Sequence, residues 1–255
     1  MCFHLSREYD MIKKEKGYGI VAKGGMIMKK RILALVLALA FALSMTACGS
    51  SAPTQQDAED CLKAILDLML TGDYDENYEF SDMTRDEAMA MRNDKFEEGF
   101  VDAFLESLDL GDIAVSDEYK NDLAKKLLDY TNQGLSKVTY TIDGWEQTDE
   151  GFTGTVTFNP IKLYQVDEAD VESMAMEYAQ ANMAKLQAMS EADMQADLLT
   201  HVMDQMVDYL VKGLDSPEAA DPVTTTIKVL VEDNTVQVDP DSLDTALTDM
   251  MNGMI

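Results

Sequence analysis

One histidine, His201, offers acid–base chemistry in the chain beyond residue 47. Asp197 lies four residues before it and Asp204 three residues after it, so a helix places all three side chains on one face. A carboxylate in that position could orient the imidazole for proton transfer. No nucleophile stands at a spacing that completes a catalytic set. We therefore expect His201 to lie at the boundary of an apolar helix face, with an enzyme using His201 or nearby carboxylates as the alternative.

A short acidic stretch could bind calcium. Asp73, Asp75 and Asn77 alternate as at the start of a calcium loop, but Tyr78 stands where an EF-hand needs glycine and Thr84 where it needs glutamate. The sequence thus excludes an EF-hand and leaves two interpretations, calcium held by clustered carboxylates or a plain acidic loop. With no histidine–cysteine cluster for zinc and no glycine-rich phosphate loop, we expect no dedicated metal site and no cofactor.

Aromatic residues offer a third kind of chemistry, the binding of an apolar or sugar ligand. Trp145 is the only tryptophan, and Tyr140, Tyr164 and Tyr178 could approach it in a concave fold. Packing into the core is the alternative. Methionines of the later helices could likewise form an adaptable binding surface or pack the helices together; they include Met174, Met183, Met189, Met194, Met203 and Met206.

The segment before Cys48 has the pattern of an export signal. Met28 is followed by three basic residues, at positions 29–31. Residues 32–43 are almost entirely apolar, and the small residues Thr46 and Ala47 precede the cysteine. The apolar run is too short for a stable transmembrane helix. The segment resembles a bacterial lipobox, which implies a diacylglycerol on the Cys48 sulfur and cleavage after Ala47. The alternatives are an ordinary signal peptide cleaved at the same place and a buried apolar helix.

These patterns divide the chain into four parts. Residues 1–27 lack any hydrophobic period and precede the basic start of the signal, so we interpret them as a mis-assigned translation start or an extra segment. Residues 28–47 form the predicted lipoprotein signal peptide, residues 48–56 a lipidated cysteine with a polar tether, and residues 57–255 one domain.

Charge excludes several classes of protein. The chain has 20 basic and 48 acidic residues, and residues 48–255 alone carry 12 basic and 45 acidic ones, a net charge of −33. A field this negative repels phosphate backbones, so we expect no nucleic-acid partner. The 46% hydrophobic content argues against disorder, and three cysteines cannot form a disulfide scaffold.

Hydrophobic periodicity predicts an α+β fold. Helical spacing and capping residues predict about five or six helices, at 57–70, 84–111, 116–134, 167–189, 190–214 and 239–250. Alternating residues predict four strands, at 138–143, 152–158, 223–231 and 236–238. The strands form two hairpins with tight turns, so we expect an antiparallel sheet of about four strands with helices over one face.

The lipobox, the helix ending in residues 70–75 and the threonine-rich hairpins make the chain similar to uncharacterised surface lipoproteins of Firmicutes, such as the class DUF5105. That resemblance implies an α+β shape like nuclear-transport-factor-like or cystatin-like domains, and it brings no catalytic motif. It also implies a protein of a Gram-positive cell membrane, anchored by lipid and facing outside.

Three functions follow as hypotheses. The sequence favours a non-catalytic module that binds an envelope ligand or protein, with the lipid membrane as a further partner through Cys48. The first alternative is an envelope hydrolase or other enzyme with a carboxylate or His201 site. The second is a purely structural or interaction domain, which predicts an exposed apolar patch instead of a pocket.

Overall fold

The computed structural model describes residues 44–46, 52–76, 78, 80, 83–107, 113–163, 166, 168–232 and 234–254. The predictions that rest on Cys48, Asn77, Tyr164 and residues 1–43 lie outside the described residues.

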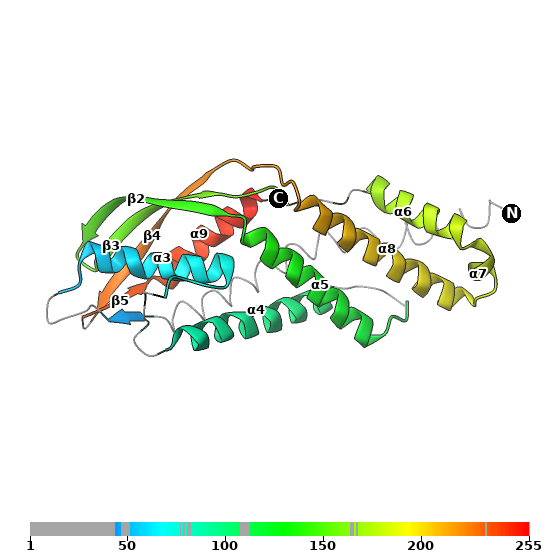
Figure 1. Ribbon diagram of the computed structural model, residues 1–255, viewed down its shortest axis with the longest axis horizontal. Helices are drawn as coiled ribbons and strands as arrows, with labels where there is room; N and C mark the ends of the chain where they lie inside the picture. Colours follow the sequence, from blue (N-terminus) through cyan, green and yellow to red (C-terminus); the bar gives the residue numbers. More distant parts are fainter. Residues whose placement is uncertain are drawn as a thin grey trace.

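One antiparallel sheet organises the described part of the chain (Figure 1). Its strands stand in the order β1-β5-β4-β3-β2 and are, in chain order, β1 (Ser44–Thr46), β2 (Thr139–Thr148), β3 (Gly151–Asn159), β4 (Val223–Glu232) and β5 (Thr235–Val238). The two predicted hairpins are β2–β3 and β4–β5, and β3 pairs with β4 in the middle. The predicted α+β class is therefore confirmed.

Strand alternation gives the sheet two unlike faces. On β3, Phe152, Val156 and Phe158 are buried, whereas the threonines between them are only partly buried. On β4 the buried Ile227 and Val229 alternate with exposed polar side chains in the same way. One face therefore carries the core and the other presents threonine hydroxyls to solvent.

The β2–β3 turn depends on a glycine. Gly151 has φ of +147°, and a Cβ there would lie 2.2 Å from the Val229 carbonyl oxygen on the neighbouring strand. Any other residue would push the strands apart, so the predicted Thr148–Gly151 turn forms for a clear steric reason.

Seven helices lie among the described residues. They are α3 (Gln55–Thr71), α4 (Arg85–Ser107), α5 (Asp117–Leu135), α6 (Glu168–Ala181), α7 (Met183–Gln187), α8 (Glu191–Gly213) and α9 (Pro240–Gly253). The predicted caps are confirmed: Ser116, Ser190 and Asp239 each accept a backbone N–H, and Thr84 forms its capping box with Glu87.

A single hydrophobic core joins the sheet to α3, α5 and α9. Its central side chains include Leu62, Ile65, Phe158, Ile227 and Leu243, all at most 1% exposed. Among the described residues, its buried members lie between Ala58 and Met254.

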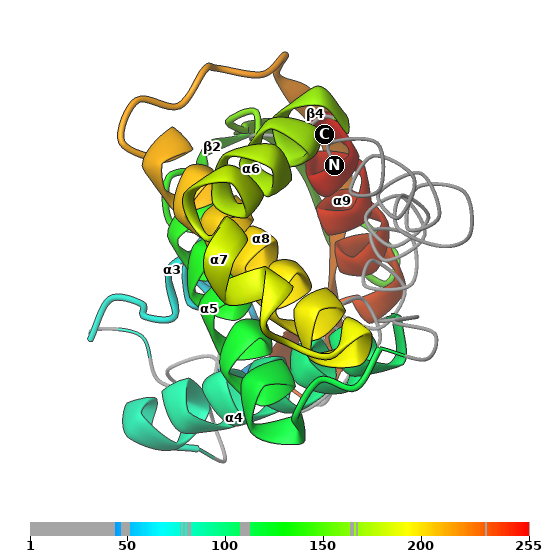
Figure 2. The ribbon, with the colours of Figure 1, turned by 90° about the vertical axis from the view of Figure 1, so that its right-hand side faces the viewer.

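Helices α6, α7 and α8 form an extension, here called the arm, residues 168–213. Figures 1 and 2 show it folding back on itself beyond the sheet, with α7 at its tip. The arm has buried residues of its own, Ala175, Leu186 and Val202, that are not part of the core. Only the last turns of α8 reach the core, through Val207 and its neighbours.

Several boundaries differ from the sequence predictions, and β2 in particular runs to Thr148, beyond the predicted end at residue 143. The predicted helix over 167–189 is broken at Asn182 into α6 and α7, and the third helix runs one residue past Gly134. A fifth strand, β1, pairs with β5 although Ser44–Thr46 belongs to the predicted signal peptide. Three residues are too few to show a period-two pattern from which that strand could be predicted.

Candidate functional site

Trp145 and Tyr140 both lie on β2, on the face of the sheet that carries the core. The Trp145 ring covers Gly154, where an added Cβ would lie 3.0 to 3.1 Å from three ring carbons. Its indole nitrogen is shielded from solvent and has no hydrogen-bond partner among the described residues. Gly154 thus provides the space that the indole fills, and the ring packs against the core while staying partly exposed.

Tyr140 serves to join β2 to α3. Its hydroxyl donates a 2.7 Å hydrogen bond to Oδ1 of Asp67, and its ring packs 6.3 Å from Phe158. Burial raises the pKa of Asp67, while the hydrogen bond from Tyr140 acts in the opposite direction. Burial, together with the bond to Asp67, raises the pKa of Tyr140 far above its usual range. This pair fixes the sheet against a helix.

The predicted ligand-binding aromatics do not gather in one place. Tyr178 lies on α6 in the arm, whereas Trp145 and Tyr140 lie on the sheet (Figure 1). A role for Trp145 or Tyr140 in ligand binding stays a prediction.

An arginine binds Asp73, the first residue of the acidic stretch that could bind calcium. Asp73 Oδ1 accepts hydrogen bonds from the Arg85 guanidinium and from the backbone N–H of Tyr74. Arg85 also donates to the Tyr74 carbonyl oxygen, 3.1 Å away. Among the described residues no group of three acidic, histidine or cysteine side chains could hold a metal ion. Calcium binding near Asp73 and Asp75 stays a prediction.

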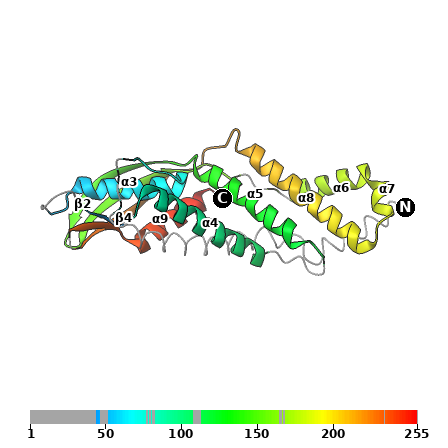
Figure 3. The ribbon, with the colours of Figure 1, turned by 60° about the horizontal axis from the view of Figure 1, so that its bottom comes forward.

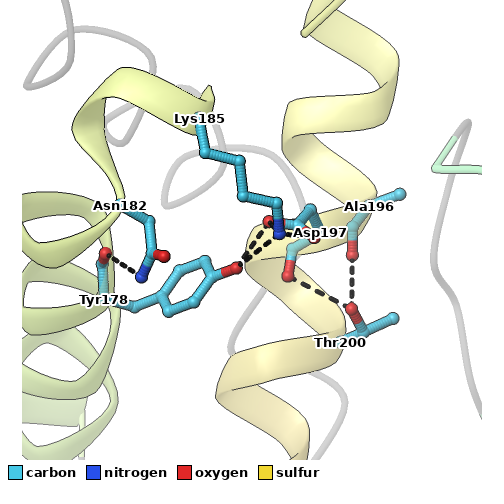
Figure 4. A network of polar contacts seen from close by, with 6 residues as sticks. All are labelled: Tyr178, Asn182, Lys185, Ala196, Asp197 and Thr200. Carbon is cyan, nitrogen blue, oxygen red and sulfur yellow. Dashed lines mark hydrogen bonds and ion pairs between the residues drawn. The ribbon is translucent and has the colours of Figure 1, made fainter. Parts of the chain in front are cut away.

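A polar network holds the arm together, and Figure 4 shows its centre. Lys185 lies on α7. Its ammonium group contacts both carboxylate oxygens of Asp197 on α8, at 2.7 and 2.9 Å. The Tyr178 hydroxyl donates to Asp197 at 2.6 Å, and Lys185 also donates to that hydroxyl. These bonds lower the pKa of Asp197 and raise that of Lys185, so both groups are charged at neutral pH.

His201 stacks on Tyr178 instead of pairing with an aspartate. The two rings are parallel within 23° and their centroids are 3.8 Å apart. Asp197 accepts from Lys185 and Tyr178, and Asp204 pairs with Lys126 of α5 at 3.2 Å. Among the described residues no hydrogen bond joins His201 to either aspartate, because Lys185, Tyr178 and Lys126 engage the two carboxylates. A catalytic role for His201 stays the alternative.

Helix α5 contacts the same polar side of α8, on the flank opposite to α6. The Tyr119 hydroxyl donates to the Thr200 carbonyl oxygen at 2.8 Å, and Lys126 bridges Asp122 and Asp204. Burial raises the pKa of Tyr119 well above its usual range, so the hydroxyl remains a donor. Asp197 and Asp204 thus serve to attach α8 to the helices on either side.

Apolar side chains of the arm remain open to solvent. The three large hydrophobic residues classed as exposed in the described chain are all in the arm: Met176 (49%), Met183 (40%) and Tyr209 (38%). None of the seven methionines of the arm is buried. In contrast, Met69, Met250 and Met254 of the core are at most 5% exposed.

This contrast bears on the two interpretations of the methionines. Side chains that served only to pack α6 against α8 would be buried as the core methionines are. Met176 and Met183 leave side-chain surface free, as an adaptable binding surface requires, whereas Met203 packs against the core. The sequence did not single out Met176 or Tyr209, although Met176 is two residues after Met174, a spacing that places the two side chains on different faces of a helix.

None of the described helices is long and apolar enough to cross a membrane. No protein-family model matches the chain, and no curated protein matches it. Among solved structures, the chain is similar to the crystal structure of "a putative lipoprotein (ycdA)" from Bacillus subtilis, with 17% sequence identity and a TM-score of 0.46. The match covers 77% of this chain and 56% of that protein, so the chain spans little more than half of its neighbour. Membership of DUF5105 and the nuclear-transport-factor-like shape stay predictions.

Proposed function

We propose that this protein is a lipid-anchored component of the cell envelope that binds another protein through its arm, without catalysis. The observation that carries the proposal is that the large hydrophobic side chains exposed among the described residues, Met176, Met183 and Tyr209, all belong to the arm. Exposed apolar surface of this kind is typical of protein interaction sites.

The engagement of the charged groups supports a binding role over an enzymatic one. A catalytic carboxylate must reach a substrate or orient a base. Asp197 is held by Lys185 and Tyr178, and Asp204 by Lys126. The imidazole of His201 faces an aromatic ring. We interpret these contacts as structural ones that hold α6 and α8 in position within the arm.

The anchor rests on the sequence before Cys48. A basic start, an apolar run and small residues before the cysteine fit lipoprotein processing. Two acyl chains hold a protein stably on a bilayer, whereas one does not. The envelope location in turn requires the binding partner to be an extracytoplasmic protein.

A double variant tests the binding surface. Met176→Glu with Met183→Glu adds two charges where apolar contact is proposed, and both positions are exposed enough to tolerate them. Thr141→Glu with Thr226→Glu is the matched control, with the same charge added on the exposed face of the sheet. The measurement is the size of the complex released from membranes in mild detergent, followed by native electrophoresis.

The proposal predicts that the wild type and the control migrate as one larger complex and that the arm variant migrates as the free protein. A wild type that migrates alone, or an arm variant that keeps the complex, would contradict it. Circular dichroism of each purified variant confirms that the fold is intact.

A further inference from the structure

Strand β1 occupies one edge of the sheet with residues that lipoprotein processing removes. Its three residues, Ser44–Thr46, pair antiparallel with residues 235–237 of β5. Cleavage after Ala47, which the lipobox implies, takes all three out of the anchored protein. Strand β5 then becomes the edge strand of the sheet, because β1 is its neighbour on that side.

The backbone of β5 directs a hydrogen-bonding pair toward β1. The N–H of Asp239, just after β5, donates to the Lys228 carbonyl oxygen of β4 at 2.9 Å. Backbone groups alternate in direction along a strand, so the N–H and C=O of Val236 point away from β4 and toward β1. Val236 lies directly opposite Met45. These two residues therefore form a hydrogen-bonded pair, and the loss of β1 removes the acceptor of the Val236 N–H.

The two edges of the sheet differ in how they resist an added strand. Strand β2, at the other edge, has a register shift between Asp143 and Glu146, with Gly144 at φ of +63° between them. Bulges and charged side chains on an edge strand hinder pairing with another chain. Strand β5, which is described in full, has the sequence Thr-Val-Gln-Val, with continuous register and neither charge nor proline. Of the two edges, the β5 edge is the one without such protection.

Helix α3 covers the core face of β5 and leaves its edge to β1. Sγ of Cys61, on α3, lies 3.8 Å from the Val236 carbonyl oxygen, and both residues are fully buried. Helix α3 also packs beside β1. A new strand in the position of β1 would therefore extend the sheet and pack beside α3 in the same way.

Charge distinguishes between a second copy of this chain and a different protein as the source of that strand. Acidic residues stand near both ends of β5, Glu232 before it and Asp239 after it. A second copy that paired antiparallel through its own β5 would bring these like charges together. Each copy of residues 48–255 also carries the net charge of −33, which repels the other. A strand from a different protein, with basic residues at its ends, has the complementary charge.

We infer that the β5 edge of the processed protein binds an extended segment of another envelope protein, which adds a strand in the place of β1 and carries basic residues at its ends. Strand addition draws its affinity from main-chain hydrogen bonds, here those of Val236, and its specificity from alternate side chains. The inference rests on the processed, lipid-anchored form in the proposed function, and it adds a second interaction surface to the arm.

The β5 edge lies near the membrane. Figures 1 and 3 show the start of α3 at one end of the molecule and α7 at the other. Figure 1 shows β5 at the end where α3 begins. Cys48 is seven residues before Gln55, the first residue of α3, so the lipid lies within about 25 Å of that helix start. The partner segment is therefore expected close to the membrane surface.

A peptide copied from β1 tests the edge. The full chain is expressed in cells, and the protein is purified from their membranes in mild detergent; its intact mass shows whether it begins at a lipidated Cys48. The probe is a fluorescent peptide of residues 42–47 with one lysine added at each end, and anisotropy measures its binding. We expect saturable binding to the processed protein.

Two N-methylated forms of the peptide are matched controls. Methylation of the amide at the position of Met45 removes the N–H that faces β5, and it should weaken binding at least tenfold. Methylation at the position of Ser44 changes an N–H that faces away from β5, and it should change binding less than twofold. Equal effects of the two methylations would overturn the inference, because binding would then not use the strand ladder.

Hydrogen exchange followed by mass spectrometry locates the bound peptide. Saturating peptide should slow exchange at residues 235–238 and leave exchange in β2 unchanged. Slowed exchange in β2, or no change in β5, would overturn the inference.

The remaining outcomes separate this inference from the proposed function. An intact mass that still includes residues 44–46 would overturn both the inference and the predicted processing, since β5 would then keep β1. A processed protein that does not bind the peptide would overturn the inference alone. A processed protein that is a dimer, separated into monomers by the peptide, would make a second copy the occupant and overturn the assignment to a different protein.

Discussion

Replacing Arg92 with methionine tests how a buried charge is accommodated in this core. Arg92 lies on α4 and is 3% exposed, and it is the one buried polar or charged side chain recorded among the described residues. Nη2 donates to the Met69 carbonyl oxygen at 3.0 Å, near the end of α3, and the guanidinium carbon lies 4.6 Å from the Phe96 ring centroid. Arg92 thus supplies a cation to the C-terminal turn of α3, which has no basic residue of its own.

Two opposing effects set the size of the change. Loss of the bond to the Met69 carbonyl costs about 2 kcal/mol, because a buried acceptor loses its donor, and loss of the ring contact costs about 1 kcal/mol. Against this, burial lowers the Arg92 pKa from 12.5 to about 10, which corresponds to roughly 3 kcal/mol spent on burying the charge. Removing the charge recovers that cost.

The terms nearly cancel, so we expect Arg92→Met to change the free energy of unfolding by no more than about 1 kcal/mol. Arg92→Ala should destabilise by about 3 kcal/mol more, since it also leaves a cavity. Urea unfolding followed by circular dichroism measures both variants. A loss above about 2 kcal/mol in Arg92→Met would refute the reasoning, because the arginine would then be a net stabiliser.

Three further predictions concern the sheet and the anchor. Asp67→Asn should raise the melting temperature at pH 7, because the amide oxygen still accepts from Tyr140 without a buried charge. Since the folded-state pKa of Asp67 is raised, the wild type gains stability as the pH falls through that pKa, and the advantage of the variant should shrink; a constant difference would contradict this. Gly154→Ala should cost about 1 kcal/mol and displace the Trp145 ring, seen as stronger acrylamide quenching of tryptophan fluorescence, and unchanged quenching would speak against the packing described. Cys48→Ala should release the protein from membranes into the medium, and quantitative retention would refute lipid anchoring.

Local chemistry made much of the fold predictable. The β2–β3 hairpin follows from alternating residues and a turn that ends in Gly151, whose geometry no other residue could adopt without a clash. Helix starts follow from side chains that accept a backbone N–H within three residues, as at Ser116 and Asp239. Each of these features depends on neighbours in sequence, so the sequence alone contains it.

The arrangement of the arm could not be predicted in the same way, because it depends on contacts that no local sequence pattern specifies. Lys185 and Tyr178 approach Asp197 and His201 only because α6 and α7 fold back onto α8. The break between α6 and α7 falls at Asn182, where neither glycine nor proline marks it. The spacing of Asp197 and His201 left open an imidazole oriented by the aspartate. In the structure the Asp197 carboxylate instead accepts hydrogen bonds from Lys185 and Tyr178. Solvent exposure of the methionines likewise depends on which helices pack beside them.

Site-specific photo-crosslinking in intact cells tests the central claim most directly. A benzoylphenylalanine at position 176 places the reactive group on the most exposed methionine of the arm, and the same residue at position 226 places it on the exposed face of the sheet. The account predicts a covalent adduct with one protein species from position 176, lost when Met183→Glu is added, and none from position 226. Adducts from position 226 alone, or none from position 176, would contradict a binding surface on the arm.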